Sequence, residues 1–335
     1  MASEGYPIGR PWLNPQCRKP WSQPNFEGTS WSTVDKTFPT EDSILSYLFD
    51  VRFGNPSPCP KCGRMANWYR IRSKRCYSTN CCGGQAIFPM SNTLFDKSRT
   101  PLRDWLHIML LFSNTRSGIA GHLIQRHFGL TYSCAHKICD RVRTHMALIE
   151  GVRQIGGPGE LVYVDEAVLR GVTTPHQKGT GRAIIMGMTN GESVATAIIP
   201  NRKIDTLMRV INDRVVAGSI IVTDGFSSYR RLAEAGWERS VVFHSQGIYV
   251  NHEGRSQAAI EAYWGVLKRV IRSTYLHMSR ENLWKYLGEF NFRYCRRRQS
   301  YRTFWDMISQ FPPLTATHLP PQGLDYVPRR WREDS

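Results

Sequence analysis

The sequence lacks any run of about 18 apolar residues, so it offers no candidate for a membrane-spanning helix. Its first residues, MASEGYPIGRPW, contain no apolar core of the kind that a signal peptide needs. It has no internal repeat and, apart from an arginine-rich C-terminal part, no low-complexity tract. We therefore expect a soluble cytoplasmic protein that has no membrane partner.

Acidic residues are scarcer than basic ones. The 335 residues include 27 Asp and Glu against 44 Lys and Arg, which gives a formal net charge of +17. An excess of this size commonly marks a polyanionic partner, and without a membrane segment the leading candidate is nucleic acid. The sequence therefore predicts a nucleoid-associated protein, with enough residues for about two domains.

The nine cysteines cannot all pair, and a chain of this length does not need disulfides to fold. Five of them lie in one short segment: Cys59, Cys62, Cys76, Cys81 and Cys82. Two cysteine-rich turns followed by glycine supply four thiolates for tetrahedral zinc. We expect a structural zinc site formed by Cys59, Cys62, Cys76 and Cys82, with Cys81 as the alternative to Cys82.

The N-terminal part divides by its periodicity. Residues 1–38 are rich in Pro and Trp without any regular period, which predicts an extended arm. The stretch TEDSILSYLFDVRF, residues 40–53, has a Thr cap, two acids and apolar residues at helical spacing. We expect this helix to lead into a zinc ribbon that together with it spans residues 39–98.

Residues 99–155 show helical periodicity throughout. One apolar-faced helix is followed by two more, and Phe128, Gly129 and Leu130 interrupt the last pair. This pattern favours a helix-turn-helix DNA-binding domain. Basic residues on the last of these helices are expected to be exposed and available to DNA: Lys137, Arg141 and Arg143.

The pattern changes to short runs rich in Val, Ile and Thr between residues 158 and 310. Their order of three strands, a helix, a strand and a helix predicts an α/β domain with a mixed sheet and helices on its faces. Asp165 ends the first expected strand and Asp224 ends the fourth. If these strands are parallel neighbours, their carboxyl ends meet at one edge of the sheet.

A third acid, Glu261, lies on an expected helix that packs against the sheet. Lys268 follows seven residues later and projects from nearly the same side, because seven residues make almost two turns. Carboxylate oxygens suit Mg²⁺, and two such ions promote phosphoryl transfer. Glu166 is expected to point to the opposite face from Asp165, as neighbours on a strand do.

The segment FNFRYCRRRQSYRTFW, residues 290–305, interleaves aromatic residues with arginines. Guanidinium groups match phosphate oxygens, so we expect four arginines to contact the DNA backbone while Phe290 and Tyr294 pack inward. The four are Arg293, Arg296, Arg297 and Arg298. Residues 311–335 form a C-terminal tail.

The motifs CPKCG, VDE, TDGFSSYRRL, IEAYWGVLKRVIRSTY and YLGEFNFRYCRRR occur in this order over residues 38–305. As a set the chain resembles the DDE transposases of bacterial insertion sequences that carry an N-terminal zinc ribbon, the group related to Merlin elements. The resemblance implies an RNase H-like catalytic core in which Asp165, Asp224 and Glu261 bind Mg²⁺ or Mn²⁺, with Lys268 as the basic residue after the last acid. Relatives commonly have Asn at the position of Ala258, and in some of them this Asn is taken as the third catalytic residue. Here Glu261 is therefore expected to be the third catalytic residue.

The resemblance also implies a function. A transposase of this kind binds double-stranded DNA at the terminal inverted repeats, cleaves it and transfers the strand to target DNA, working as a homodimer or a higher homo-oligomer. The alternative is a DNA-binding regulator with an inactive transposase-derived core. A nuclease of the RNase H type would keep the three acidic residues but would not need so large an N-terminal region for DNA recognition.

Overall fold

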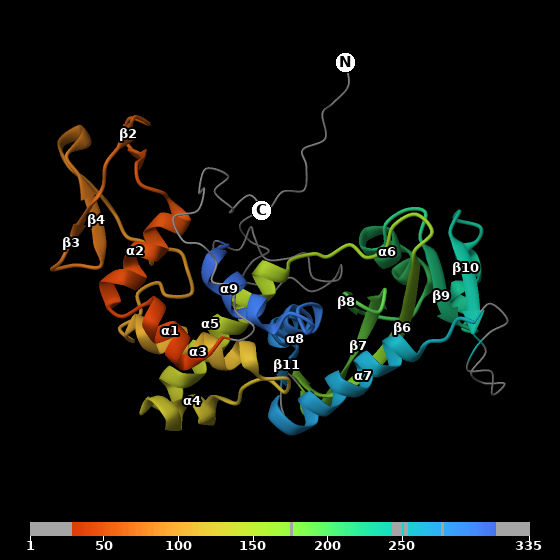
Figure 1. The fold of residues 1–335 in the computed structure, drawn as a ribbon. Helices are drawn as coiled ribbons and strands as arrows, with labels where there is room; N and C mark the ends of the chain where they lie inside the picture. The colour runs from red at the N-terminus through yellow and green to blue at the C-terminus, as the bar shows by residue number, and fades with distance from the viewer. Residues whose placement is uncertain (1–28, 175–176, 243–249, 251–253, 276–277, 313–335) are drawn as a thin grey trace, which may run out of the picture.

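The computed structural model describes residues 29–174, 177–242, 250, 254–275 and 278–312. The expected arm and tail therefore lie largely outside the described residues. Figure 1 shows three parts: a zinc-ribbon region, a helical body and a sheet flanked by helices. No helix in the described part of the chain is both long and apolar enough to span a membrane.

The expected leading helix is confirmed as α2 (Glu41–Arg52). Thr40 caps it, because its hydroxyl accepts a hydrogen bond from the Ser43 amide at 3.1 Å. The ribbon that follows contains two small antiparallel sheets. Their strands are β1 (Ser57–Pro58) with β2 (Met65–Ala66), and β3 (Tyr69–Ile71), β4 (Cys76–Thr79) and β5 (Gln85–Ile87).

The end of the expected extended arm is helical. Helix α1 (Trp31–Thr37) is capped by Ser30, whose hydroxyl accepts a hydrogen bond from the Thr33 amide at 3.2 Å. Asp35 pairs with Arg103 and His107 of α3 (Leu102–Asn114), so this short helix is tied to the body. The prediction of an extended arm is wrong here because fewer than two helical turns show little period.

The pair of helices expected on either side of residues 128–130 is confirmed as α4 (Gly121–Phe128) and α5 (Tyr132–Glu150). Gly129 ends α4 in the left-handed region, with φ 61°, which suits a residue without a Cβ. Thr131 caps α5 by accepting from the Cys134 amide. Local turn chemistry therefore sets this break.

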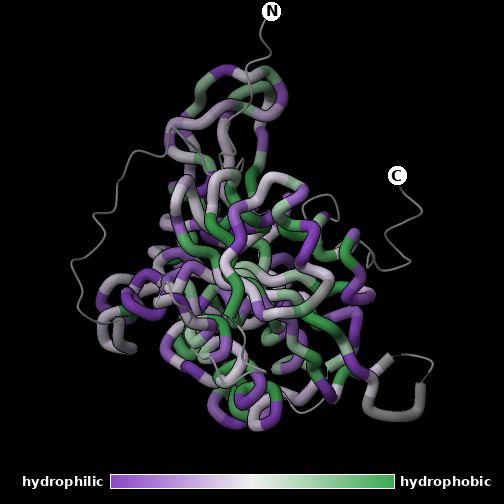
Figure 2. The backbone as a smooth tube through the Cα atoms, turned by 90° about the vertical axis from the view of Figure 1, so that its right-hand side faces the viewer, coloured by the Kyte–Doolittle hydropathy of each residue, from purple (hydrophilic) through white to green (hydrophobic). Residues whose placement is uncertain are grey.

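The helical body also takes in the C-terminal helices α8 (Leu283–Cys295) and α9 (Ser300–Ser309). Phe292, Phe304 and Phe311 belong to the same apolar core as α2, α3 and α5. The division into a helix-turn-helix domain over 99–155 and a catalytic domain over 158–310 therefore does not describe the packing. Figure 2 shows hydrophobic segments running through the middle of the molecule.

The sheet has the strand order β10-β9-β6-β7-β8. Its strands are β6 (Leu161–Thr174), β7 (Gln177–Thr189), β8 (Val194–Ile199), β9 (Ile220–Asp224) and β10 (Glu238–Val242), and a short sixth strand, β11 (Met278–Ser279), pairs in parallel with the end of β6. β7 is antiparallel to both of its neighbours, β6 and β8, whereas β9 is parallel to both β6 and β10. This mixed order, 3-2-1-4-5, is the RNase H-like arrangement, and it confirms the expected fold class.

Helices cover both faces of the sheet. α7 (Ala258–Val270) and α8 pack on one face against Ala167, Leu169 and Ile185. α6 (Ile204–Arg214) packs on the other face against Val162 and Val164. In Figure 1 α7 runs along one side of the sheet and α6 lies on the other. Alternate residues of β6 thus enter two different cores, as strand geometry requires.

His145 makes the fold sensitive to acid. It is fully buried on α5, and one ring nitrogen donates to the Met307 carbonyl at 2.7 Å. Burial lowers the pKa of His145 from 6.5 to about 4. A depressed pKa stabilises the fold above pH 6.5, and this stabilisation is lost as the pH falls from 6.5 toward 4.

The free energy of unfolding of the parent should therefore fall when the pH is lowered from 7 to 5. In His145→Gln this fall should be smaller by about 2 kcal/mol. Denaturant unfolding of both proteins at the two pH values measures this difference. Equal losses in parent and variant would show that His145 does not carry the effect.

Candidate active site and zinc centre

Asp165 and Asp224 lie on neighbouring parallel strands, as expected. β9 ends at Asp224, but Asp165 is not at the end of its strand, because β6 continues to Thr174 in a long hairpin with β7. The ladder between β6 and β9 nevertheless ends at Tyr163 and Val222, two residues before each acid. Both carboxylates therefore stand where the two strands part.

Burial is the main cause that raises the pKa of Asp165 above its ordinary value. The negative charge of Asp224 raises it further, whereas the Trp264 hydrogen bond and the positive charge of Lys268 lower it. The two aspartates therefore repel one another across the split between the strands. A divalent cation is the kind of charge that relieves such repulsion, and hard carboxylate oxygens are its preferred ligands.

Trp264 of α7 orients Asp165. Its indole nitrogen donates to Asp165 Oδ2 at 3.0 Å. The ring lies over Gly187, the partner of Asp165 in the β6–β7 register, where an added Cβ would meet the ring at 2.6 Å. Only glycine leaves room for this contact, which the sequence pattern did not reveal.

We expect Gly187→Ala to displace Trp264 and to cost about 1–3 kcal/mol of unfolding free energy. Gly265→Ala, also on α7, is the control, because no atom lies within 4 Å of an added Cβ there. That control should be neutral or stabilising, since Ala favours a helix over Gly. Unfolding midpoints in denaturant measure both, and a neutral Gly187→Ala would contradict the contact.

Glu261 and Lys268 flank Trp264 on α7, one turn before it and one turn after it. They thus lie along the side of the helix that carries the Asp165 contact. Glu261 is exposed, and among the described residues the three acids do not form a tight group of carboxylate oxygens. The structure brings Asp165 and Asp224 together and places Glu261 on the adjoining helix.

Glu166 points away from Asp165, as expected, and has partners of its own. It accepts a hydrogen bond from the Tyr229 hydroxyl, and Arg202 Nε lies 3.8 Å from its other oxygen. Burial is the main cause that raises the pKa of Glu166 to about 7. Tyr229 is 1% exposed and follows Asp224 by five residues, in the 3-10 helix η2 (Ser227–Leu232).

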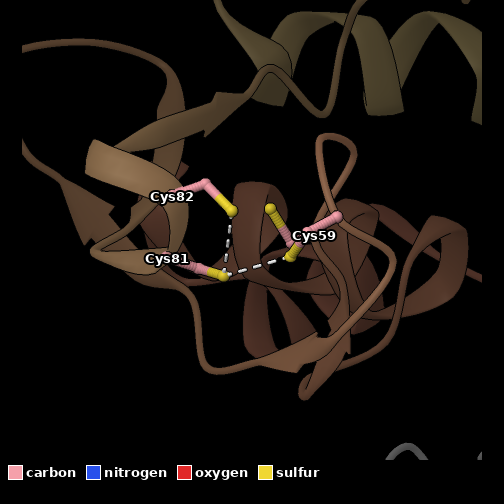
Figure 3. Close-up of side chains that lie close together, drawn as sticks. Cys59, Cys81 and Cys82 are labelled. Carbon is pink, nitrogen blue, oxygen red and sulfur yellow. Dashed lines mark hydrogen bonds between the residues drawn. The ribbon is translucent and has the colours of Figure 1, made fainter.

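The sulfur atoms of four cysteines gather in the ribbon: Cys59, Cys62, Cys81 and Cys82. All four lie within 4.8 Å of one another, and Figure 3 shows Cys81 and Cys82 reaching from one turn toward Cys59. The Arg64 amide is the main cause that lowers the pKa of Cys62 to about 6. Four convergent sulfurs, one readily ionised, fit a tetrahedral zinc site.

Cys76 is not in this group, which corrects the expected ligand set. It begins β4, where it is buried at 3% exposure and pairs with Ile71 in the ladder. Cys82 adopts the left-handed region with φ 54°, and its sulfur lies 3.8 Å from that of Cys81. The turn after β4 thus supplies two adjacent cysteines, and both Cys81 and Cys82 belong to the group of four sulfurs.

We expect Cys81→Ala to lose the bound zinc and Cys76→Ala to keep it. Removing one of four ligands opens a structural site, whereas Cys76 contributes only packing. Zinc content of the purified proteins, measured by mass spectrometry, distinguishes the two variants. Zinc lost from Cys76→Ala but retained by Cys81→Ala would restore the original ligand set.

Two arginines expected at DNA are enclosed by the protein. Arg293 donates to Glu289 at 3.0 Å and to the carbonyls of Thr115 and Arg116. Arg296 pairs with Glu150 and Asp306, and its guanidinium lies 3.7 Å from the centre of the Phe292 ring. The prediction of DNA contact is wrong for both, because their side chains are largely buried and their guanidinium groups pair with acids inside the protein.

Other basic residues have mixed outcomes. Arg143 is buried at 6% exposure, not exposed as expected, and Arg141 donates to the carbonyls of Leu94 and Asp96. Lys137 is exposed on α5. Arg297 and Arg298 are also exposed, although both contact the turn at residues 191–192. Lys137, Arg141, Arg297 and Arg298 thus stay predictions for DNA binding.

Comparison with known proteins supports this layout. A family described as the ISXO2-like transposase domain matches residues 157–294, and the transposase zinc-ribbon domain matches residues 39–85. No curated protein matches the chain. Among solved structures, the crystal structure of a pre-cleavage Mos1 transpososome is similar at 10% identity and a TM-score of 0.26. The match covers 61% of this chain and 77% of the Mos1 chain. No function is inferred from so weak a likeness.

The zinc ribbon and the RNase H-like core define a DDE transposase with an N-terminal zinc ribbon. The match to the ISXO2-like transposase domain spans residues 157–294, the part of the chain that carries Asp165, Asp224 and Glu261.

Proposed function

We propose that the protein binds the terminal inverted repeats of an insertion sequence and catalyses metal-dependent cleavage and transfer of DNA strands. The observation that supports this most is the pair Asp165 and Asp224, on adjacent parallel strands beside the helix of Glu261 and Lys268. A DNA partner is also consistent with the net charge of +17.

Each acid has a defined part in the proposed site. Asp165 and Asp224 would hold Mg²⁺ or Mn²⁺ together with Glu261, and Trp264 would keep Asp165 in place. When bound, such cations stabilise the attacking and leaving oxygens of an in-line displacement at phosphorus. Lys268 provides a positive charge beside the site, where the DNA phosphate would lie.

The proposed reaction has two steps. Hydrolysis of one phosphodiester at the element's end first breaks a P–O bond and leaves a 3′ hydroxyl. That hydroxyl then attacks a phosphodiester of target DNA, so a new P–O bond forms as the target strand breaks. Both ends must be held together for this, so we propose a homodimer or a higher homo-oligomer.

The ribbon and the helix pair α4–α5 would bind the repeats. Between residues 57 and 95 there are six basic residues and no acidic one: Lys61, Arg64, Arg70, Arg72, Lys74 and Arg75. Lys137 lies exposed near the start of α5. Each phosphate neutralised adds about 0.9 to the salt slope of binding, so affinity should fall steeply with salt.

The test is incubation of the full chain with labelled terminal-repeat duplex and Mg²⁺. Nicking at a defined end followed by joining supports the proposal. Binding without cleavage would favour a DNA-binding regulator, and cleavage without joining would favour a nuclease.

A further inference from the structure

The backbone does not hold Asp165 and Asp224 at a fixed separation. The β6–β9 ladder pairs Leu161–Tyr163 with Ile220–Val222 and ends two residues before each acid. At the level of the acids each strand is paired on its outer side, Asp165 with Gly187 and Asp224 with Val242. Another contact must therefore set the gap between the two carboxylates.

A side-chain hydrogen bond spans this gap. Tyr229 donates its hydroxyl proton to Glu166, the residue that follows Asp165. Tyr229 itself lies in η2, the short helix that follows Asp224. The side chain of Glu166 is 8% exposed and Tyr229 is 1% exposed, so water does not compete for this bond.

The segment from Asp224 to Tyr229 is held as one unit. The Phe226 amide donates to Asp224 Oδ1 at 3.0 Å. Arg239 donates to the Asp224 carbonyl and to the Thr223 hydroxyl, both at 3.0 Å, and lies 6.0 Å from the centre of the Tyr229 ring. A shift of Tyr229 would therefore be transmitted to Asp224.

A second link joins the same carboxylate to the end of β8. Arg202 approaches Glu166, and the Ser228 hydroxyl of η2 donates to the Arg202 carbonyl at 3.1 Å. Glu166 thus receives contacts from both segments that border this edge of the sheet.

We propose that Glu166 and Tyr229 are positioning residues that set the separation of Asp165 and Asp224 and thereby the affinity for divalent cations. This inference rests on the proposed metal-dependent function. Groups that orient the direct ligands commonly change metal affinity 10–100-fold when they are removed.

The test measures binding of Mn²⁺ to the full, zinc-loaded chain without DNA, by the decrease in the spin-resonance signal of free Mn²⁺. Tyr229→Phe removes the hydroxyl alone and is expected to raise the apparent Kd for Mn²⁺ about 10-fold or more. Tyr275→Phe is the matched control, because its hydroxyl donates to a buried glutamate, Glu289, at 2.7 Å. The control is expected to bind Mn²⁺ like the parent.

Substitutions of Glu166 test the same bond from its acceptor side. Glu166→Gln keeps an oxygen for the Tyr229 hydroxyl and should stay within about threefold of the parent Kd. Glu166→Ala removes the acceptor and should weaken binding like Tyr229→Phe, and it replaces that variant should the latter not fold. A loss in Glu166→Gln as large as in Asp224→Asn would make Glu166 a ligand and overturn the proposal.

Asp224→Asn distinguishes failure of the metal site from failure of the positioning role of Tyr229 and Glu166. If the parent shows no Mn²⁺ binding that depends on Asp224, the proposed metal site itself fails. If Asp224→Asn abolishes binding but Tyr229→Phe and Glu166→Ala match the parent, only the positioning role is overturned.

Discussion

Asp224→Asn is expected to abolish strand cleavage and leave binding to terminal-repeat DNA intact. The amide has the size of the carboxylate and keeps an oxygen that can accept from the Phe226 amide, so the local turn should survive. It lacks the negative charge that a divalent cation requires of its ligand. We expect single-turnover cleavage to slow by about 10³-fold or more.

Asp213→Asn is the matched control. Asp213 lies on α6, its side chain is 55% exposed, and it pairs with Arg214 away from the site. The same chemical change there should leave cleavage unaltered. Cleavage by Asp224→Asn at the parent rate would remove Asp224 from the site, whereas loss of DNA binding would show that the variant disrupts more than the metal ligand.

Glu289→Ala is expected to destabilise the whole helical body. Glu289 is completely buried and pairs with Arg143 at 3.1 Å and with Arg293 at 3.0 Å. Arg143 also donates to the Ile119 carbonyl at 2.6 Å. The carboxylate therefore joins α5, α8 and the connection between α3 and α4.

Removing Glu289 leaves two buried guanidinium groups without an anion, which costs about 3–5 kcal/mol of unfolding free energy. Glu192→Ala is the control, because its pair with Arg298 is exposed at 66% and 72% and contributes little. Denaturant unfolding midpoints measure both variants. Equal midpoints for Glu289→Ala and the parent would show that the buried network does not stabilise the fold.

The elements that local patterns encode were predictable. The Thr40 cap, the break at Gly129 and the runs of Val and Ile gave α2, the α4–α5 pair and the strands of the sheet. The neighbouring positions of Asp165 and Asp224 followed from the pairing of parallel strands. The helices and strands could be predicted because their caps and apolar runs lie within a few residues of each feature.

Features that depend on distant partners could not be predicted from the sequence. Arg143 and Glu289 are 146 residues apart, so nothing in the pattern distinguished a buried arginine from one that meets DNA. Arg293 and Arg296 were assigned to DNA because their contacts with residues 115–116 and with Glu150 are similarly distant in the sequence. The Trp264 contact with Asp165 was missed because Trp264 fitted the apolar spacing of its helix.

The zinc ligands show a different limit. Spacing alone does not tell whether Cys76 lies on a strand or in a turn, and β4 begins at this residue. The doublet of Cys81 and Cys82 was treated as a choice between two ligands, whereas the left-handed backbone at Cys82 lets both sulfurs face the centre. A cysteine gives no sequence signal for that conformation, unlike glycine, asparagine, aspartate or histidine.

The proposed strand cleavage and transfer require divalent cations bound between Asp165 and Asp224, with Glu261 as the third ligand. Anomalous diffraction from crystals of the protein with terminal-repeat DNA and Mn²⁺ tests this directly. We predict a manganese peak between the two aspartates with a Glu261 oxygen coordinated to it. Manganese bound elsewhere, with Glu261 directed away from both aspartates, would contradict the account.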